Sequence, residues 1–468
     1  ERPHTCNSVF ATIRRAWVRQ KIREIVSRKA FSPSELSFTL KDKYAVDVDN
    51  VMISHALNDL KRETQESIPF GLLGSFLRTL SSENEGTATS LNSNEGLFER
   101  AFLAPAMCIA AFQHTTGVIG LDACHIKASY GGVLLVMTVL DGNGNVFPAA
   151  LGIAESENTS SWTWFLTLVK TPFRIEDGSG VVFLSDRDKG IDAAVSGVFP
   201  REKHSYCAYH IEKNLKRNHH TRLKGLVFKA AKATTPREFE ETLQEMKTLN
   251  AEAGNYIKGI EKERWARAFF PAPRFGHVTS NISESMNHWL EEARHKDPVA
   301  LFSTYIRHLN QLFETRREEY QSMNQTDLPQ TVAEIFNKSL DDSRKLLVLR
   351  NTHTVFEVQR KNEPDLFRVV KLDPPSCSCG FFWEYGVPCR HLCAAMLSIK
   401  ENPYRLIVRE RLLSSLRETY VGVTVPIDLS TLDNDGLRAV TREKKRGRPK
   451  EKRFRSATEK GRKKKVMC

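Results

Sequence analysis

Two aspartates, each at the end of an apolar run, constrain this chain most. Residues 116–121 lead into Asp122, and residues 181–185 lead into Asp186. Short apolar runs of this kind are typical of buried strands, so both carboxylates are expected at neighbouring strand ends. Carboxylates placed in this way are ligands that a hard cation prefers. The stretch 118–210 therefore predicts a metal site at a sheet edge, and in a basic protein such a site indicates phosphate chemistry.

Further elements surround the two aspartates. The apolar runs 133–140 and 146–152 flank turn residues at 141–145, which is a strong short-range signal for a β-hairpin. The elements that follow are a helix, a strand, a helix and a strand, at 160–169, 181–185, 190–198 and 202–206. This order predicts an α/β fold built on a mixed sheet.

The positive charge of the chain is concentrated at one end. The 468 residues carry a formal net charge of +13. Residues 441–468 contain 14 Lys or Arg and 3 Glu, a net charge of +11, which leaves about +2 for residues 1–440. The length indicates about two to four domains. No stretch approaches the roughly 18 uninterrupted apolar residues of a membrane span, so no membrane is expected. The chain opens on Glu1 without a Met, as a fragment would.

Four residues near the C-terminal end have the spacing of a metal site. Of nine cysteines, Cys377, Cys379 and Cys389 lie close together, and His391 completes two pairs of ligands. Three thiolates and one imidazole are typical of a closed, structural Zn²⁺ site. The arrangement resembles the SWIM zinc finger, Cys-x-Cys followed by Cys-x-His. The odd number of cysteines also favours a reduced compartment over a disulfide framework.

The basic tail has a motif of its own, which consists of Arg446, Gly447, Arg448, Pro449 and Lys450. Proline fixes an extended backbone, glycine permits close approach to a surface, and the arginines suit a narrow A·T-rich minor groove. The motif resembles an AT-hook. A nuclear-import signal explains the same residues without groove binding, and the two explanations are compatible. A tail of this composition is expected to be disordered when free.

The ordered set of motifs resembles the Mutator-like (MULE) transposases. The set consists of Asp122, Asp186 within Ser-Asp-Arg, Cys207-x-x-His210, Glu284 within 279–287, and the zinc finger. The resemblance covers roughly residues 70–400. The plant far-red-response transcription factors, which are domesticated relatives of these transposases, share the layout.

The resemblance implies a catalytic core with an RNase H-like fold and a mixed five-stranded sheet. It also implies that Asp122, Asp186 and Glu284 are catalytic and hold two Mg²⁺ or Mn²⁺ ions. Two metal ions clamp the attacking and leaving oxygens of one phosphodiester, so cleavage and strand transfer are the same displacement. The family often has Gly-Thr after the first aspartate, whereas Ala123 and Cys124 stand here.

Some of these assignments have competitors. Asp188 competes with Asp186, and Glu291 and Glu292, about two helical turns downstream, compete with Glu284. The Cys207 and His210 pair is either a buried strand end or a motif for DNA-end binding or site architecture.

The predicted domains follow from these motifs. Residues 1–80 form an N-terminal helical domain, which is either a DNA reader of the helix-turn-helix kind or a plain packing domain. The other predicted segments are a linker at 81–97, the RNase H-like domain at 98–297 with a helical insertion at about 211–265, a helical segment at 298–354, the SWIM finger at 355–400, a helical or irregular connector at 401–440, and the basic tail at 441–468.

Three functions are consistent with the sequence. The first is a DDE-type DNA transposase that cleaves transposon ends and joins them to target DNA in the nucleus. The second is a domesticated, transposase-derived DNA-binding regulator of transcription. The third is a zinc-bearing interaction protein with an inert core. Double-stranded DNA, as terminal repeats and target, is the expected partner, and homo-oligomerisation is left open.

Overall fold

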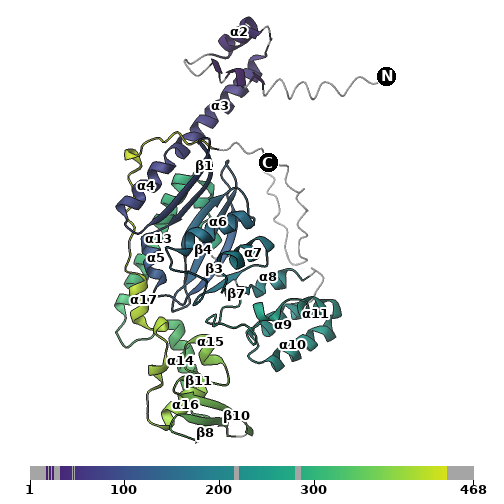
Figure 1. Cartoon of the computed structure of the whole chain (residues 1–468), viewed down its shortest axis with the longest axis vertical. Helices are drawn as coiled ribbons and strands as arrows, with labels where there is room; N and C mark the ends of the chain where they lie inside the picture. The colour runs from purple at the N-terminus through teal and green to yellow at the C-terminus, as the bar shows by residue number, and fades with distance from the viewer. Residues whose placement is uncertain are drawn as a thin grey trace, which may run out of the picture.

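In the computed structural model, the described residues are 17–18, 20–22, 24–25, 32–44, 46, 48–215, 221–279, 286–361 and 363–439. The fold is mixed α/β (Figure 1). A seven-stranded sheet has the order β1-β2-β5-β4-β3-β6-β7, and a smaller four-stranded sheet belongs to the zinc-finger region. In the described part of the chain, no helix has both the length and the apolar character needed to cross a membrane.

The large sheet combines antiparallel and parallel strands. Its strands are β1 (Ala88–Asn94), β2 (Leu97–Ala104), β3 (Val118–His125), β4 (Val133–Leu140), β5 (Val146–Ala154), β6 (Val182–Ser185) and β7 (His204–Tyr206). Strands β3, β4 and β5 are antiparallel neighbours, and β6 and β7 continue the sheet parallel to β3. Strand β4 is buried along its whole length, which explains why all its residues except Thr138 are apolar; the Thr138 hydroxyl donates to Gly120 O at 3.1 Å.

Helices cover both faces of the large sheet. Helices α6 (Thr159–Lys170) and α7 (Lys189–Val198) lie in front of it in Figure 1, and α5 (Ala106–Phe112) and α13 (Pro298–Ser322) lie behind. Gly152 of β5 leaves room for Phe165 of α6, because a Cβ there would lie 2.7 Å from the ring. On the other face, Phe147 of β5 packs edge-on against Phe313 of α13.

The prediction that Asp122 lies at a strand end is wrong. It lies inside β3, which continues to His125 because β4 pairs with it that far, with His125 opposite Val133. Strand β6, the other neighbour of β3, stops at Ser185. Asp122 is therefore at the point where β3 loses its parallel partner.

The predicted linker 81–97 is replaced by regular structure, and the predicted five-stranded sheet becomes seven-stranded. Helix α4 (Leu73–Glu83) leads into β1, which forms a hairpin with β2. Glu95 and Gly96 at its turn have φ of 49° and 73°, as a two-residue type I′ turn requires. The stretch is polar because β1 is an edge strand whose residues are exposed or only half-buried.

The N-terminal helices form a small unit set apart from the body at the far end of α3 (Figure 1). Its elements are α2 (Pro33–Tyr44) and α3 (Asn50–Gly71), and its core contains Val18, Ile22, Leu36, Leu40 and Ile53. Ser32 and Glu35 form a capping box at the start of α2, with Ser32 N to Glu35 Oε2 at 2.6 Å.

The insertion is helical and has its own core. It comprises α8 (Ala208–Lys213), α9 (Thr221–Lys232), α10 (Pro236–Leu249), α11 (Ala251–Lys258) and the short η1 (Lys262–Arg264). Phe239, Leu243, Met246 and Trp265 are among its buried residues.

The finger region begins earlier than residue 355. After α14 (Gln330–Ser343), strand β8 (Leu346–Arg350) pairs with β9 (Val355–Arg360), so the end of the predicted helical segment 298–354 belongs to this sheet. The remaining elements are β10 (Glu363–Leu372), β11 (Pro375–Cys377), α15 (Phe381–Tyr385) and α16 (Arg390–Ser398).

The predicted connector 401–440 returns to the large sheet. It contains η3 (Pro403–Leu406), η4 (Arg409–Arg411), α17 (Leu413–Thr419) and η5 (Leu429–Thr431). Tyr420 is fully buried against Phe147 and Phe313, and its hydroxyl donates to Asp141 Oδ2 at 2.8 Å. The segment therefore completes the core.

Candidate functional site

The sheet register brings the two predicted aspartates level. Strands β3 and β6 are parallel, with Gly120 opposite Leu184. Asp122 lies two residues after Gly120 on β3, and Asp186 lies two residues after Leu184, directly after the end of β6, so the register brings the two aspartates near each other where β6 ends. Burial is the main cause that raises the pKa of Asp122 to about 6, and the nearby charge of Asp186 adds to it.

The competitor Asp188 is engaged elsewhere. It is the N-cap of α7, and its Oδ1 accepts a hydrogen bond from Gly190 N at 2.7 Å. Its own N–H donates to Asp186 Oδ1 at 3.0 Å. Asp188 therefore starts the helix and holds one oxygen of Asp186.

The chain returns to Asp122 after the helical insertion. The Nδ2 of Asn287 donates to Asp122 Oδ2 at 2.9 Å, and this bond lowers the pKa of Asp122 against the effect of burial. Glu284, the predicted third ligand, lies outside the described residues. Its competitors form surface ion pairs: Glu291 with Lys127, and Glu292 with Lys296 at 2.6 Å.

Glu157 lies close enough to Asp122 and Asp186 for their charges to shift its pKa. The sequence did not predict Glu157 as a site residue. It lies between β5 and the N-cap of α6, Asn158, and the indole Nε1 of Trp162 is 3.4 Å from its Oε1. Burial is the main cause that raises the pKa of Glu157 to about 7. The charges of Asp186 and Asp122 raise this pKa further, whereas the bond from Trp162 opposes them. The available signal was an acid between an apolar strand and a helix start.

The packing of α6 on α7 explains the position of Glu157. A Cβ on Gly190, in the first turn of α7, would lie 3.1 Å from Thr159 N, at the start of α6. The two helices therefore begin side by side, and the turn before α6 comes next to the turn that follows β6.

Cys207 and His210 also belong to this region. Cys207 is the N-cap of α8, and its N–H donates to Ser185 O at 2.8 Å. A hydrogen bond with Cys207 raises the pKa of His210, and the charges of Asp186 and Asp122 raise it further. The imidazole of His210 therefore interacts electrostatically with both carboxylates.

The finger brings its four predicted ligands together. One ligand atom from each of Cys377, Cys379, Cys389 and His391 lies within 4.8 Å of the others. The Nδ1 of His391 is 3.7 Å from Cys377 Sγ and 3.8 Å from Cys389 Sγ. Tetrahedral Zn²⁺ with bonds of about 2.0–2.3 Å separates its ligand atoms by about 3.5–3.8 Å, so the donor set and its size fit Zn²⁺.

Local backbone geometry forms this cluster. Gly380 and Gly386 bound α15 at φ of 69° and 65°, a left-handed conformation that favours glycine. These two turns fold the segment between the ligand pairs back on itself. Among the described residues, no other group of three or more Cys, His, Asp or Glu side chains brings ligand atoms this close. The Asp122 and Asp186 pair thus needs a further ligand to complete a comparable site.

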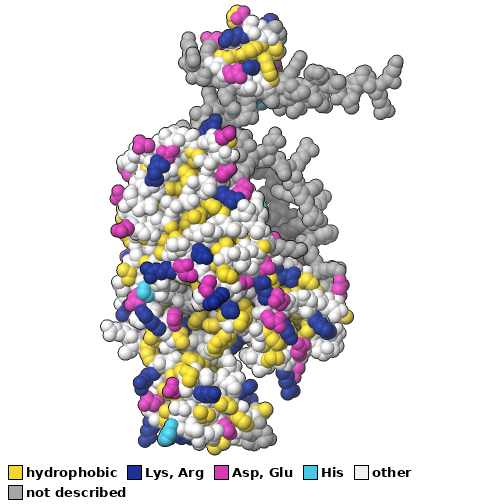
Figure 2. Space-filling view, in the orientation of Figure 1, with side chains coloured by type: hydrophobic (Ala, Val, Ile, Leu, Met, Phe, Trp, Pro, Cys, Tyr) yellow, Lys and Arg dark blue, Asp and Glu magenta, His cyan; other side chains and the backbone are white. Residues whose placement is uncertain are grey.

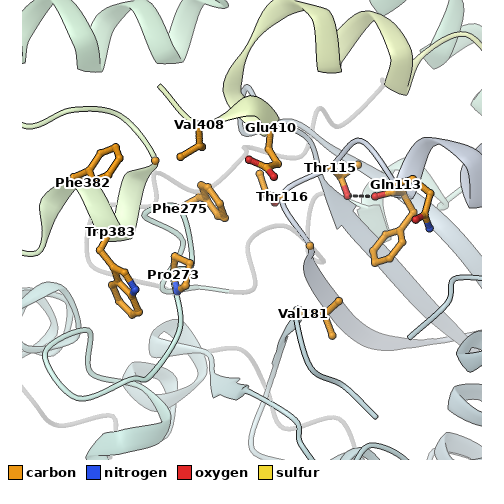
Figure 3. A pocket seen from close by; sticks show the side chains of 14 residues that line it. Gln113, Thr115, Thr116, Val181, Pro273, Phe275, Phe382, Trp383, Val408 and Glu410 are labelled. Atoms are coloured by element: carbon orange, nitrogen blue, oxygen red, sulfur yellow. Dashed lines mark hydrogen bonds between the residues drawn. The ribbon is translucent and has the colours of Figure 1, made fainter. Parts of the chain in front are cut away.

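A cavity of about 460 Å³ lies elsewhere, between the finger and the large sheet (Figure 3). Thr116 and Val181, which precede β3 and β6, line it together with Phe275, Trp383 and Glu410. It is therefore at the opposite ends of the strands from Asp122 and Asp186.

Acidic and basic side chains are interspersed over the face of the body shown in Figure 2. This distribution agrees with the small net charge of residues 1–440. The AT-hook-like motif from Arg446 to Lys450 lies outside the described residues.

Comparisons with known proteins match two regions of the chain, one in the large sheet and one in the finger. A family model described as MULE transposase domain matches residues 118–214, and one described as SWIM zinc finger matches residues 356–400. Protein FAR1-RELATED SEQUENCE 4 of Arabidopsis thaliana is 22% identical over 360 residues, which cover 68% of this chain and 48% of the relative. Protein FAR1-RELATED SEQUENCE 5 of the same plant is 21% identical over 395 residues, 75% of this chain and 48% of the relative.

The chain spans about half the length of these two curated relatives. The first family match contains Asp122, Asp186, Cys207 and His210, and the second contains all four ligands of the finger. The two matches also occur in the order that the sequence motifs predict. This chain is therefore a MULE transposase-like protein with a SWIM zinc finger.

Proposed function

We propose that the chain is a DDE-type DNA transposase, which cleaves transposon ends and joins them to target DNA with the help of divalent metal ions. One observation carries the proposal: Asp122 on β3 and Asp186, directly after the end of the parallel neighbour β6, are close enough for the charge of Asp186 to raise the pKa of Asp122, and both lie inside the region that matches a MULE transposase domain. The strand order β5-β4-β3-β6-β7, with three antiparallel strands followed by two parallel ones, supports an RNase H-like fold for this core.

In this proposal, Asp122 and Asp186 hold the metal, and Glu284 supplies the third carboxylate. The position of Asn287 supports the assignment of Glu284, because Asn287 lies three residues later in the chain and its side chain donates to Asp122. Mg²⁺ or Mn²⁺, when bound, would activate the attacking oxygen and neutralise charge on the phosphodiester. Asp122 must lose its proton to act as a ligand, and Asn287 favours the charged form by donating to it.

The remaining residues of the site have supporting roles. Glu157 lies near enough to the pair for the charges of Asp186 and Asp122 to raise its pKa, but in the structure its carboxylate does not converge with theirs as a third ligand. The charges of the same carboxylates raise the pKa of His210, which suits this residue to site architecture or to contact with a DNA end. The SWIM finger would hold one structural Zn²⁺ through its three thiolates and His391.

Double-stranded DNA is the proposed partner, and the nucleus the proposed location. The charge of the tail supports both, because a protein that neutralises phosphates with Lys and Arg binds DNA electrostatically. The small N-terminal helical unit is a candidate second contact with DNA.

A nicking assay tests the proposal. The full chain is incubated with Mn²⁺ and duplexes that carry the flanking genomic ends of its own element. We expect nicking that Asp122→Ala and Asp186→Ala abolish while DNA binding persists. Asp177→Ala is the matched control, because this surface residue pairs with Arg201 at 3.5 Å, away from the site. Equal nicking by the parent and both site variants contradicts the assignment.

The layout shared with the plant far-red-response transcription factors supports a second function, a transposase-derived DNA-binding regulator of transcription. The departure at Ala123 and Cys124 from the family's Gly-Thr agrees with it. Such a protein binds DNA with the same finger and tail and does not depend on Asp122. DNA binding by the parent chain without nicking in Mn²⁺ would select this function.

A further inference from the structure

We propose that a hydrogen-bond relay from Arg264 through His204 to Ser185 positions Asp186, and that it links the helical insertion to the carboxylate pair. The inference rests on the proposed function of Asp186 as a metal ligand. Ser185, His204 and Arg264 would act as positioning residues and would not touch metal or substrate.

The first step of the relay is at the end of β6. The hydroxyl of Ser185 donates to the backbone oxygen of Asp186 at 2.7 Å. A hydroxyl has one proton to donate, so the contact between Ser185 Oγ and His204 Nε2, at 2.8 Å, must use Oγ as the acceptor. His204 Nε2 therefore carries a proton.

The second step assigns the other imidazole nitrogen. The Nη2 of Arg264 lies 2.9 Å from His204 Nδ1, and a guanidinium only donates. Asp192 Oδ1, which only accepts, competes for the same nitrogen at 3.2 Å. The shorter contact with Arg264 and the proton on Nε2 favour Nδ1 as an acceptor, which makes the imidazole neutral with its proton on Nε2. Burial lowers the pKa of His204, which agrees with the neutral form.

Three charged residues, Asp192, Arg264 and Glu202, act on His204. Asp192 of α7 lies 3.2 Å from His204 Nδ1, and its Oδ1 accepts from Arg264 Nη2 at 2.6 Å. The guanidinium of Arg264 lies over the ring of Tyr206 at 4.5 Å, and the more distant Glu202 acts on His204 by charge alone. Arg264 is thus fixed by Asp192 and is able to donate to the imidazole.

Burial makes this relay more than a surface network. Ser185 is fully buried and His204 is 3% exposed, so water does not replace a lost partner readily. The backbone oxygen of Ser185 also accepts from Cys207 N at 2.8 Å. Ser185 is therefore held from two sides, and the direction in which Asp186 leaves β6 is set by groups on β7 and η1.

Direct measurement of Mn²⁺ binding to the full chain tests the relay. Electron paramagnetic resonance of free Mn²⁺ reports the affinity without requiring DNA or turnover. We expect Ser185→Ala to lower the affinity by about tenfold, as removal of an outer hydrogen-bond partner of a metal ligand commonly does. Ser185→Thr, which keeps the hydroxyl, should retain most of the affinity. Unchanged Mn²⁺ affinity in a folded Ser185→Ala variant overturns the relay.

A second measurement does not depend on variants that fold. In the parent protein, ¹⁵N nuclear magnetic resonance should show His204 neutral and protonated on Nε2 at pH 7. Protonation on Nδ1 overturns the relay, whatever the metal does.

Failure of the proposed function can be distinguished from failure of the relay. If the parent chain does not bind Mn²⁺, the metal site is wrong. The relay is then decided by hydrogen exchange of the Asp188 amide, which donates to Asp186 Oδ1 at 3.0 Å. Faster exchange in Ser185→Ala than in Ser185→Thr supports the relay, and equal exchange rates overturn it.

Discussion

The side-chain amide of Asn287 donates to the carboxylate of Asp122 across 2.9 Å, although the two residues are 165 positions apart in the chain. This bond joins the segment that follows the helical insertion to the middle of β3. It also opposes the burial that raises the pKa of Asp122, because a donor to the charged form favours that form. A carboxylate kept in a costly environment and supported by a distant residue is typical of a functional position.

The buried charge of Asp122 predicts a pH-dependent gain of stability in Asp122→Asn. The pKa of Asp122 rises from its usual value near 3.8 to about 6 in the folded protein. The folded state therefore holds a proton that the unfolded chain loses as pH rises from 4 to 6, and the penalty is complete above 6. Without metal, we expect Asp122→Asn to raise the free energy of unfolding by roughly 1–3 kcal/mol at pH 8 and by much less at pH 4. Urea unfolding at both pH values measures it, and equal changes at both contradict the assigned burial.

Substitutions of Glu157 and of nearby Glu155 should affect Mn²⁺ binding differently. If it completes the carboxylate site, Glu157→Gln should weaken Mn²⁺ binding by about tenfold or more, because the substitution removes a ligand or its close partner. Glu155→Gln is the matched control, since Glu155 pairs with Arg100 at the surface, with Arg100 Nε to Glu155 Oε2 at 2.9 Å. Electron paramagnetic resonance of Mn²⁺ compares the two variants. The role of Glu157 is refuted if both bind Mn²⁺ as the parent does.

The pH dependence of Mn²⁺ binding follows from the same carboxylates. Asp122, with a pKa of about 6, and Glu157, with a pKa of about 7, are protonated at lower pH and then do not ligate a cation. Affinity should fall as pH drops from 8 to 5. Asn287→Ala removes the donor that favours the charged form of Asp122, so it should move the midpoint to higher pH. A midpoint that stays in place, or moves down, argues against the Asn287 contact.

Much of the candidate site could be predicted from the sequence because its signals are local. The turn 141–145 and the apolar runs before Asp122 and Asp186 specify strands by nearest-neighbour chemistry alone. The ligand spacing of the finger is equally local, since Cys377 and His391 are only 14 residues apart. In such cases, a short window contains most of the physical information.

The rest depends on packing between distant segments. Glu157 follows an apolar strand, which is a local signal, but it comes near Asp186 because α6 and α7 start side by side, and the packing of two helices is not encoded in a short window. The sequence of β1 is typical of a loop because an exposed edge strand carries polar residues on both faces. Residues 401–439 have the composition of a connector, yet Arg411 is buried and donates to Gly142 O at 2.8 Å.

Zinc removal should affect the finger selectively. We expect Cys389→Ser to lose bound Zn²⁺ and to speed hydrogen exchange across residues 375–395, because a structural metal supplies much of the folding energy of its loop. Cys393→Ser is the control, since its thiol lies 3.7 Å from Pro388 O, outside the ligand cluster. Elemental analysis counts the metal. Loss of Zn²⁺ in both variants, or in neither, contradicts the ligand set.

The basic tail predicts how DNA affinity responds to salt. Residues 441–468 carry a net charge of +11. Deleting them should flatten the plot of log affinity against log salt by about 0.9 for each phosphate that the tail neutralises in the parent chain. A double substitution separates the two explanations of the motif. Replacing Arg446 and Arg448 with Ala should remove a preference for A·T-rich over G·C-rich duplexes if the arginines enter the minor groove. Replacing Lys463 and Lys464 removes the same charge and should leave that preference intact. If the two pairs behave alike in fluorescence anisotropy, the tail acts through charge alone, and groove binding by the Arg-Gly-Arg-Pro motif is excluded.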